Sequence, residues 1–461
     1  MREVYTVEQV RTAERTVMAR VPPGALMRRA AFGLAVVARR MVAQARGHRV
    51  TLLVGAGDNG GDALWAGAEL RRRGVGVSAV LLDPQRAHAA GLAALRGAGG
   101  RVVDAGPGGA AAVARADLVL DGIVGLSGRG SLRPAAAELV GVAGSVGVPV
   151  LAVDSPSGVD PETGAVDGPA VTAAATVTFG ALKPVHVLAA HRCGPVELVD
   201  IGLGPELPDP HVVVLDEADV AARWPVPAPA DDKYTQGVTG VAAGSATYPG
   251  AAVLASGAAV LATSGMVRYS GTAADLVRAR WPEVIATGEF ADAGRALLAA
   301  VLDRDVPVCV DADGLTLLGE HADLRSALSG RPVVLTPHDR EFARVAGEVG
   351  PDRVGAARRA AAELGVTVLL KGNATVVADP GGRTLVHPSV TSWAATAGSG
   401  DVLTGIVGAL LAAGLEPWWA AGCGAFVHAR AAELAANGAP APSSAIQGAI
   451  PDAIRSIRAA A

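Results

Sequence analysis

The stretch Val50–Asp62 reads VTLLVGAGDNGGD and decides the fold of the first half of the chain. Its apolar run Val50–Val54 predicts a buried strand, and the glycines after it predict a turn into a helix from about Ala63 to Arg73. Backbone N–H groups at a helix start favour phosphate oxygens, and glycine lets a ligand approach the chain closely. The stretch therefore predicts one strand–turn–helix unit of a parallel α/β sheet, with a candidate ligand site at its turn.

Glycines alone fit a plain tight turn equally well, so the polar residues must decide between the two interpretations. Asn59 and Asp62 favour a ligand site, because a turn requires neither. Asp62 would repel a phosphate unless it binds a hydroxyl or supports the loop, which suits recognition of a ribose or a nicotinamide. Asp83, after the next apolar run, only loosely matches the acid that binds ribose in dinucleotide sites.

Alternation of short apolar runs with helical segments continues through this half, and it is typical of a parallel sheet covered on both faces. Further strands are predicted at Val75–Leu82, Leu118–Leu120, Val148–Val153, Thr176–Phe179 and Val196–Val199.

Two more polar motifs follow these runs, DGIVGLSGRGS at Asp121–Ser131 and DSPSGVD at Asp154–Asp160. Ligands of open α/β sheets bind at the carboxyl ends of the strands, so we expect Asn59, Asp121 and Asp154 to lie together. Such a group could hold a cation through oxygen ligands or perform acid–base work. The structural alternatives are a flexible surface loop for the first motif and ordinary Asp-Ser-Pro turn chemistry for the second.

Composition narrows the class of protein. A length of 461 residues indicates two or three domains, and a net charge of −4 provides no basic field for nucleic acid. The distant cysteines Cys193, Cys309 and Cys423 argue against a disulfide framework and suit a cytoplasmic protein. The most apolar stretch, Val402–Val427, is interrupted by an acid and a proline, so we expect a buried helix pair and no membrane partner.

Lysine is rare, because nearly all basic residues are arginine and the only lysines are Lys183, Lys233 and Lys371. A position that keeps lysine in such a chain suggests a site that needs a compact ammonium group, which the planar guanidinium does not replace.

Six prolines between residues 205 and 229 mark a break, since proline fits neither a helix interior nor a central strand. We therefore predict a domain over 1–207, a proline-rich linker over 208–230, with a short strand at His211–Leu215, and a second domain over 231–461.

The second half repeats the alternation of strands and helices. Strands are predicted at Val238–Ala243, Pro307–Val310, Val333–Leu335, Val366–Leu370, Ala374–Ala378 and Arg383–Val386, and helices at Ala251–Thr263, Gly400–Ala413 and Trp418–Ala436.

Four motifs of this half carry candidate chemistry. Gly398–Asp401 precedes a long helix, whose first N–H groups can hold an anion while Asp401 accepts the proton of a hydroxyl; an N-cap is the alternative. Lys371–Thr375 follows a strand and suits a phosphate. His338, three residues before Glu341, could contact a ligand or merely neighbour a helix cap. Asp311–Asp313 could support a cation-bound phosphate.

The three motifs of the first half, in this order, resemble the NAD(P)H-hydrate epimerase domain, and the flanks Tyr5–Glu14 and Phe179–Pro184 agree. The resemblance implies a Rossmann-like, three-layer fold and potassium at Asn59, Asp121 and Ser157. It implies Asp154 as the acid–base group and as a substrate contact. Asp58 and Ala63 depart from the usual Asn and Gly. The other implied substrate-binding residues are Asp58, Asn59, Gly60, Gly61, Asp62, Gly125, Leu126, Ser127, Gly128, Arg129, Gly130 and Ser131.

The motifs of the second half, with Lys233-Tyr234, Gly244-Ser245 and Ser392-Trp393, resemble the ADP-dependent NAD(P)H-hydrate dehydratase, a ribokinase-like α/β fold. The resemblance implies ADP as co-substrate with Mg²⁺, and Asp401 as the catalytic base. It implies that Ala251, His338 and Asp401 contact the hydrated nucleotide. The implied adenine-nucleotide contacts are Lys371, Gly372, Asn373, Ala374, Thr375, Gly398, Ser399 and Gly400.

One departure concerns the segment between Glu283 and Asp311, where this family has a strand and a Gly-Pro-Gly-type loop that the sequence lacks. Arg340 also stands where a glycine is usual. We expect an enzyme that epimerises and dehydrates hydrated NADH and NADPH, acting on small molecules as a homo-oligomer. The alternatives are an active epimerase with an impaired dehydratase half, a ribokinase-like kinase with a regulatory first half, and a nucleotide-binding module without chemistry.

Overall fold

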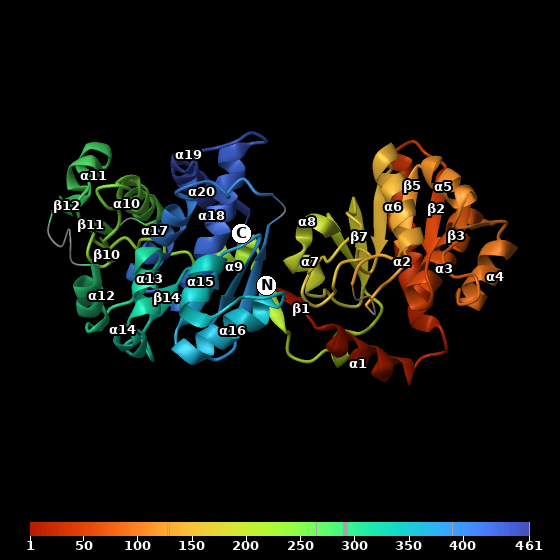
Figure 1. The fold of residues 1–461 in the computed structure, drawn as a ribbon, viewed down its shortest axis with the longest axis horizontal. Coiled ribbons are helices and arrows are strands. Elements are labelled where there is room, and N and C mark those ends of the chain that lie inside the picture. The colour runs from red at the N-terminus through yellow and green to blue at the C-terminus, as the bar shows by residue number, and fades with distance from the viewer. Residues whose placement is uncertain (127, 129, 264, 289–293, 390, 461) are drawn as a thin grey trace. The chain divides into compact units, whose positions relative to one another are not determined.

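The computed structural model describes residues 1–126, 128, 130–263, 265–288, 294–389 and 391–460. The chain divides into a first unit, Glu3–Val212, and a second unit, Met1–Arg2 with Val213–Ala461 (Figure 1). The division falls inside the expected linker 208–230, but that segment is not a free tether. It contains β9 (Val212–Val214) and α9 (Glu217–Arg223), and Val220 of α9 is fully buried in the core of the second unit. Apolar residues between the prolines therefore pack most of this segment against the second unit.

A fully parallel sheet forms the centre of the first unit, with strand order β4-β3-β2-β5-β6-β7-β8. Its strands are β2 (Arg49–Val54), β3 (Gly76–Leu81), β4 (Arg101–Asp104), β5 (Leu118–Gly122), β6 (Val150–Val153), β7 (Ala175–Phe179) and β8 (Val196–Val199). Sequence patterning missed β4, whose side chains are half-buried or exposed at the sheet edge. The order reverses between β2 and β5, so the loops after β2, β5 and β6 meet at one edge of the sheet.

Helices cover both faces of this sheet. Leu52 and Leu120 pack with α1 to α4 on one face, and their neighbours Leu53 and Val119 pack with α5 and α6 on the other. This alternation of core-facing side chains produces the three-layer, Rossmann-like arrangement expected from the sequence. The helices are α1 (Val7–Met18), α2 (Ala25–Gln44), α3 (Asp58–Arg72), α4 (Ala89–Gly97), α5 (Pro107–Ala114), α6 (Pro134–Val146), α7 (Val185–Leu188) and α8 (Ala190–Cys193), with a 3₁₀ turn at Gly204–Glu206.

Two sheets build the second unit. The larger has the order β1-β9-β17-β16-β15-β14-β13, and the smaller, β10-β11-β12, is parallel. Sequence patterning missed the short strands β11 and β12. The bounds are β1 (Arg2–Val4), β13 (Val308–Val310), β14 (Val333–Leu335), β15 (Thr367–Leu370), β16 (Ala374–Ala378), β17 (Thr384–Pro388), β10 (Val238–Val241), β11 (Met266–Ser270) and β12 (Ile285–Thr287).

The separation of the two sheets coincides with the segment that departs from the dehydratase pattern. After β12 the described chain resumes in α12 (Gly294–Leu302) and then enters β13, which ends the larger sheet. Residues 289–293 lie outside the described part. No described strand between Glu283 and Asp311 other than β12 and β13 is available to join the sheets.

Long apolar helices form the core beside both sheets. Two of these helices, α10 (Gly250–Ala262) and α17 (Ser399–Ala412), approach closely, since a Cβ at Gly405 would lie 2.3 Å from the carbonyl oxygen of Ala255. With α18 (Pro417–Ala436), α17 forms the buried helix pair predicted for Val402–Val427, and no described helix is long and apolar enough to cross a membrane. The remaining helices are α11 (Ala274–Arg280), α13 (Asp313–Glu320), α14 (Ala322–Ser326), α15 (Asp339–Ala346), α16 (Arg353–Leu364), α19 (Ser443–Gly448) and α20 (Ile450–Ala460).

Candidate active sites

A cavity of about 630 Å³ opens at the carboxyl ends of β2, β5 and β6 in the first unit. It brings together side chains and backbone from all three sequence motifs. Ser127 and Arg129 lie outside the described residues. The predicted residues that line it are Asp58, Asn59, Asp62, Gly125, Leu126, Gly128, Gly130, Ser131 and Asp154.

Gly60 and Gly61, predicted as substrate contacts, do not line this cavity. Both are buried in α3, and a Cβ at Gly60 would lie 2.3 Å from the carbonyl oxygen of Gly55. Gly55 is itself packed against Ile123, whose carbonyl oxygen would lie 1.8 Å from an added Cβ. These glycines therefore let the helix, the turn and the β5 loop pack closely, and so shape the cavity from behind.

Asp154 is held by a buried polar network. Its Oδ1 accepts hydrogen bonds from Lys183 Nζ (2.6 Å) and Thr178 Oγ1 (2.9 Å), and its φ of 67° lies in the left-handed region. Lys183 is 1% exposed and also donates to the carbonyl of Phe179 (3.0 Å). Burial alone would raise the pKa of Asp154, but the Lys183 ammonium holds that pKa below its ordinary value. Asp154 is therefore a carboxylate at neutral pH.

The neutral side chain of His186 fixes the backbone of Asp154. Nδ1 of His186 accepts the backbone N–H of Lys183 (2.9 Å), so Nε2 is the nitrogen that donates to the carbonyl oxygen of Asp154 (2.8 Å). Burial, together with the charge of Lys183, lowers the pKa of His186 to about 4. The contact stabilises the unusual backbone of Asp154 and leaves its carboxylate toward the cavity.

Of the three predicted potassium ligands, Asn59 lines the cavity, whereas Asp121 and Ser157 do not. Ser157 donates to Asp121 through both its hydroxyl (2.7 Å) and its N–H (2.8 Å), and the N–H of Val124 donates to the same hydroxyl (3.0 Å). Asn59 lies beside Gly125, the residue after Val124, since a Cβ at Gly125 would lie 2.9 Å from Asn59 Oδ1.

Two observations are compatible with a cation at this place. Asp121 is 0% exposed, burial raises its pKa to about 6, and none of the ion pairs found among the described residues includes it. The buried Nδ2 of Asn59 has no hydrogen-bond acceptor within the described structure. A half-turn of the carboxamide would exchange its two terminal atoms and put the oxygen at this unpaired position. A buried carboxylate with hydroxyl and carboxamide oxygens beside it matches the oxygen ligands that such an ion prefers.

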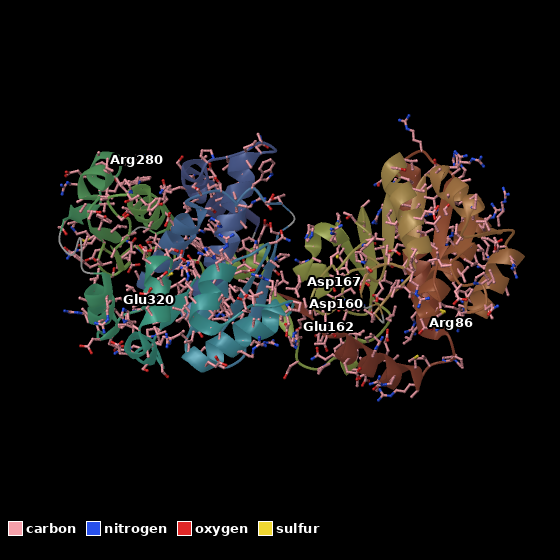
Figure 2. All side chains as sticks on the ribbon, in the orientation of Figure 1. Arg86, Asp160, Glu162, Asp167, Arg280 and Glu320 are labelled. Atoms are coloured by element: carbon pink, nitrogen blue, oxygen red, sulfur yellow. The ribbon has the colours of Figure 1, made fainter. Side chains whose placement is uncertain are left out.

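Sequence reasoning did not assign several groups around this cavity. Arg11 and Glu14 come from α1, Arg86 (Figure 2) from the segment after β3, and Arg133 from the start of α6. Lys183 carried one signal, the scarcity of lysine, but no pattern tied it to Asp154. Asp160, the end of the third motif, is structural: its Oδ1 accepts the N–H groups of Glu162 and Thr163 (both 2.9 Å), a turn that Figure 2 locates.

A second cavity, of about 510 Å³, lies in the second unit where α17 begins. Lys371, Gly372, Asn373, Thr375, His338, Ser399 and Gly400 line it, as the sequence predicted.

The other predicted residues of this half do not line that cavity. Ala374 is buried within β16, Gly398 packs on Leu254 as the N-cap of α17, and Ala251 is half-buried in the first turn of α10. Asp401 lies one residue beyond the lining, in the first turn of α17.

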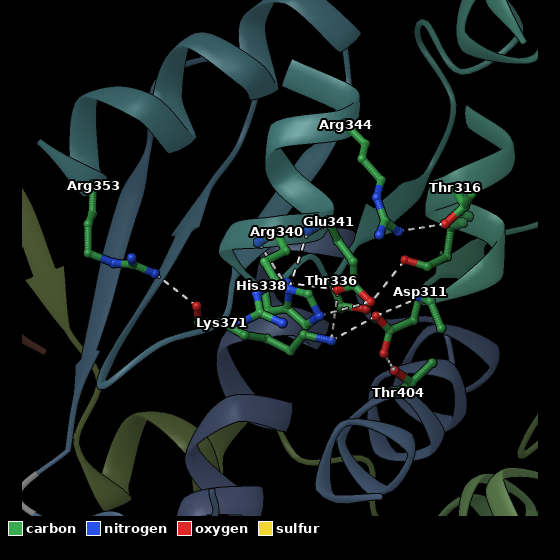
Figure 3. Close-up of polar contacts among 12 residues, drawn as sticks. Asp311, Thr316, Thr336, His338, Arg340, Glu341, Arg344, Arg353, Lys371 and Thr404 are labelled. Carbon is green, nitrogen blue, oxygen red and sulfur yellow. Dashed lines mark hydrogen bonds and ion pairs between the residues drawn. The ribbon is translucent and has the colours of Figure 1, made fainter. Parts of the chain in front are cut away.

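An ion pair connects the phosphate and cation motifs (Figure 3). Lys371 Nζ donates to Asp311 Oδ1 (2.7 Å), and Thr404 Oγ1 donates to Asp311 Oδ2 (2.7 Å). A Cβ at Gly400 would lie 3.4 Å from Lys371 Nζ, so the ammonium stands at the N-terminus of α17. That geometry combines a positive charge with the free N–H groups of a helix start, which together attract an anion.

Asp401 lies in the electrostatic field of this ion pair. Burial raises its pKa to about 6, the negative charge of Asp311 adds to this, and Lys371 opposes it. A carboxyl that titrates close to neutral pH is suited to accept a proton from a hydroxyl.

His338 both caps a helix and lines the cavity. Its Nδ1 accepts the N–H groups of Arg340 (3.1 Å) and Glu341 (3.3 Å), while Glu341 accepts the N–H of His338 (2.9 Å). Glu341 also lies 3.6 Å from Lys371 Nζ, so the cap belongs to the same polar group (Figure 3). The helix cap is therefore observed, and the contact of His338 with a ligand stays a prediction for a residue that lines the cavity.

His387 of β17 and His428 of α18 also line this cavity, and no sequence motif marked them. His428 Nε2 lies 2.9 Å from Ser399 Oγ, and burial lowers the pKa of both rings to about 4. Two neutral rings therefore border the same cavity as the charged Lys371 group.

Together these features define a two-unit α/β protein with a separate nucleotide-type cavity in each unit. A family model described as YjeF-related protein N-terminus matches residues 23–185, and one described as NAD(P)H-hydrate dehydratase matches residues 289–451. The chain belongs to the family of bifunctional NAD(P)H-hydrate repair enzymes, and the predicted Rossmann-like and ribokinase-like α/β fold is confirmed.

Similar proteins extend over nearly the whole chain. Bifunctional NAD(P)H-hydrate repair enzyme Nnr of Mycobacterium leprae is 56% identical, with 95% of this chain and 94% of that protein covered. The protein of the same name from Mycobacterium tuberculosis is 57% identical over 90% of each chain. Among solved structures, the ADP/ATP-dependent NAD(P)H-hydrate dehydratase of Bacillus subtilis is 26% identical, with a TM-score of 0.47, covering 53% of this chain and 99% of that one.

Proposed function

We propose that the first unit interconverts the two epimers of hydrated NADH and NADPH, with Asp154 as the base. The observation that carries this is the buried Lys183–Asp154 pair, which supplies a carboxylate to the cavity at neutral pH. The glycine-rich loop 125–131 and the start of α3 would hold the pyrophosphate through backbone N–H groups. Potassium at Asn59, Asp121 and Ser157 would supply a fixed positive charge beneath that loop.

The second unit would remove the hydroxyl from one epimer with ADP. Asp401 takes the proton of the ring hydroxyl, the hydroxyl oxygen accepts the terminal phosphoryl group of ADP, and AMP leaves. The N–H groups at Gly398–Gly400 and the ammonium of Lys371 stabilise the charge of the transferring group. Phosphate then leaves the ring carbon while the neighbouring carbon loses a proton, which restores the double bond of the ring.

Magnesium is compatible with this site. Protein magnesium sites commonly use one or two carboxylates and leave the other positions to phosphate and water. Asp311, which contacts Lys371 and Thr404, would be a carboxylate of this kind. The groups Lys371, Gly372, Asn373 and Thr375 along the cavity would contact the adenine nucleotide.

One observation favours a second candidate, an active epimerase with an impaired dehydratase. The sheet of the second unit is divided where the family has an inner strand and a Gly-Pro-Gly-type loop. The adenine-nucleotide side of the site, around Lys371 and Gly400, does not depend on that segment. Loss of the loop would therefore weaken contacts to the hydrated nicotinamide more than contacts to ADP.

An assay with mixed hydrate epimers separates these possibilities. The full-length protein is incubated with both epimers, with and without ADP, while epimer ratio and nicotinamide absorbance are followed. Full recovery of both epimers with ADP supports the bifunctional proposal. Epimer exchange without recovery leaves only the first unit active, and recovery of one epimer only would contradict the epimerase. We also propose a cytoplasmic location, supported by three free cysteines; the expected homo-oligomer stays a prediction.

A further inference from the structure

A second carboxyl in the first cavity has no hydrogen-bond or ion-pair partner among the residues that the structure describes. Asp62, in the second turn of α3, is 8% exposed and lines the same cavity as Asp154. None of the hydrogen bonds or ion pairs found among the described residues includes its side chain. A polar group that is nine-tenths buried is normally paired, so its unpaired carboxyl indicates a ligand contact.

The surroundings of Asp62 are acidic. Asp154, Asp58 and Glu14 act on it electrostatically from three different elements, and Lys183 is the cation that acts on it. That ammonium already contacts Asp154 directly. Burial first, and then these like charges, raise the pKa of Asp62 well above its ordinary value. The remaining charged groups of the cavity wall are Arg11, Asp83, Arg86 and Arg133.

We propose that Asp62 is the proton donor of the epimerase, acting on the substrate opposite the acceptor Asp154. The proposal rests on the epimerase function above and adds to it the residue that supplies the acid. Two carboxyls in one cavity can take opposite roles when one is paired with an ammonium and the other is unpaired.

The chemistry of the substrate requires such a pair. Water adds to an enamine at the carbon bonded to nitrogen, so the hydroxyl of the hydrated ring stands next to the ring nitrogen. Asp62 gives its proton to that hydroxyl, the C–O bond breaks, and the nitrogen lone pair forms a C=N bond. The water released adds to the other face of the same carbon while Asp154 takes its proton, and the C=N electrons return to nitrogen. The substrate is unchanged in composition, and the proton returns from Asp154 to Asp62 through the cavity.

The isosteric variant Asp62→Asn tests this assignment. It should lower the epimerase kcat by roughly 10²–10⁴-fold, the range of acid–base catalysis, with little change in KM. In the wild-type protein the rate should fall at high pH, as Asp62 loses its proton, and this alkaline limb should be absent from the residual activity of Asp62→Asn. The Asp104→Asn variant, at an exposed site on β4, is the matched control and should keep the wild-type rate.

Other outcomes have distinct meanings. A raised KM with unchanged kcat would show that Asp62 only binds a hydroxyl, and would overturn the proposal. Unchanged kinetics in Asp62→Asn would also overturn it. A misfolded variant is recognised by loss of the wild-type circular dichroism, and Asp62→Glu, which keeps the acid, should then recover part of kcat. Failure of the wild-type protein to exchange epimers without ADP would instead defeat the epimerase function itself.

Discussion

Lys183 Nζ lies 2.6 Å from Asp154 Oδ1, and both side chains are buried beneath the first cavity. A buried ion pair has a large desolvation cost, and removing only one of its two partners leaves the other as an isolated buried charge. The main effect of the pair is therefore to keep Asp154 ionised, and its contribution to the stability of the fold is smaller. It explains why a fully buried carboxyl can remain ionised as a base.

Replacement of Lys183 by Met should destabilise the first unit by about 3–5 kcal/mol at pH 7, because Asp154 is left as an unpaired buried charge. Hydrogen exchange of peptides from β6 and β7 in urea measures this in the full-length protein. The double variant Lys183→Met, Asp154→Asn removes both charges and should recover much of the loss. Equal destabilisation in the single and double variants would contradict a charge-based explanation.

Potassium should stabilise the first unit. A ligand that binds only the folded state adds RT ln(1 + [L]/Kd), which is roughly 2.7 kcal/mol at a hundred times Kd. Thermal unfolding in potassium chloride should therefore occur at a higher temperature than in choline chloride at equal ionic strength. Asp121→Asn should abolish the difference, and Asp104→Asn should retain it. A difference that survives in Asp121→Asn would place the ion elsewhere.

The short motifs of the sequence predicted which strand ends would meet at a cavity, while the roles of their residues stay predictions. Asn59, Asp121 and Asp154 come from three strand ends, and parallel pairing alone brings such ends to one edge. Lys371, which follows a strand, and Ser399, which the sequence placed at a helix start that can hold an anion, both line the second cavity. The glycines were predicted least reliably, because the sequence around Gly60 and Gly61 fits a phosphate-binding loop and close backbone packing equally well.

Other features depend on contacts that sequence patterns do not encode. Lys183 and Asp154 are 29 residues apart, and their pairing requires β7 to lie beside β6. His428 meets Ser399 only because α18 packs on α17. The strand pattern of β11 and β12 is short, and the helix α9 was hidden among prolines whose spacing suggested a linker.

Stability measurements should show the charge state of Asp62 independently of activity. Its pKa is raised in the folded protein, so its contribution to stability is fully present below the unfolded pKa and is lost as pH rises through the folded pKa. The Asp62→Asn variant has no carboxyl at this position, so it does not lose this stability as pH rises. The variant should therefore gain thermal stability over the wild-type protein at pH 8, and the gain should shrink toward pH 4. A gain that does not vary with pH would show that Asp62 is not titrating.

The dehydratase step should follow the ionisation of Asp401, whose pKa burial raises to about 6. A base must be deprotonated, so the ADP-dependent rate should increase with pH through about 6 and level off above it. Asp401→Asn should lower that rate by roughly 10²–10⁴-fold while ADP binding, measured by calorimetry, stays within a few fold. Epimer exchange without ADP should be unchanged in this variant, because Asp401 lies in the other unit. If Asp401→Asn abolished ADP binding as well, the residue would be part of the nucleotide site and the base would have to be another group.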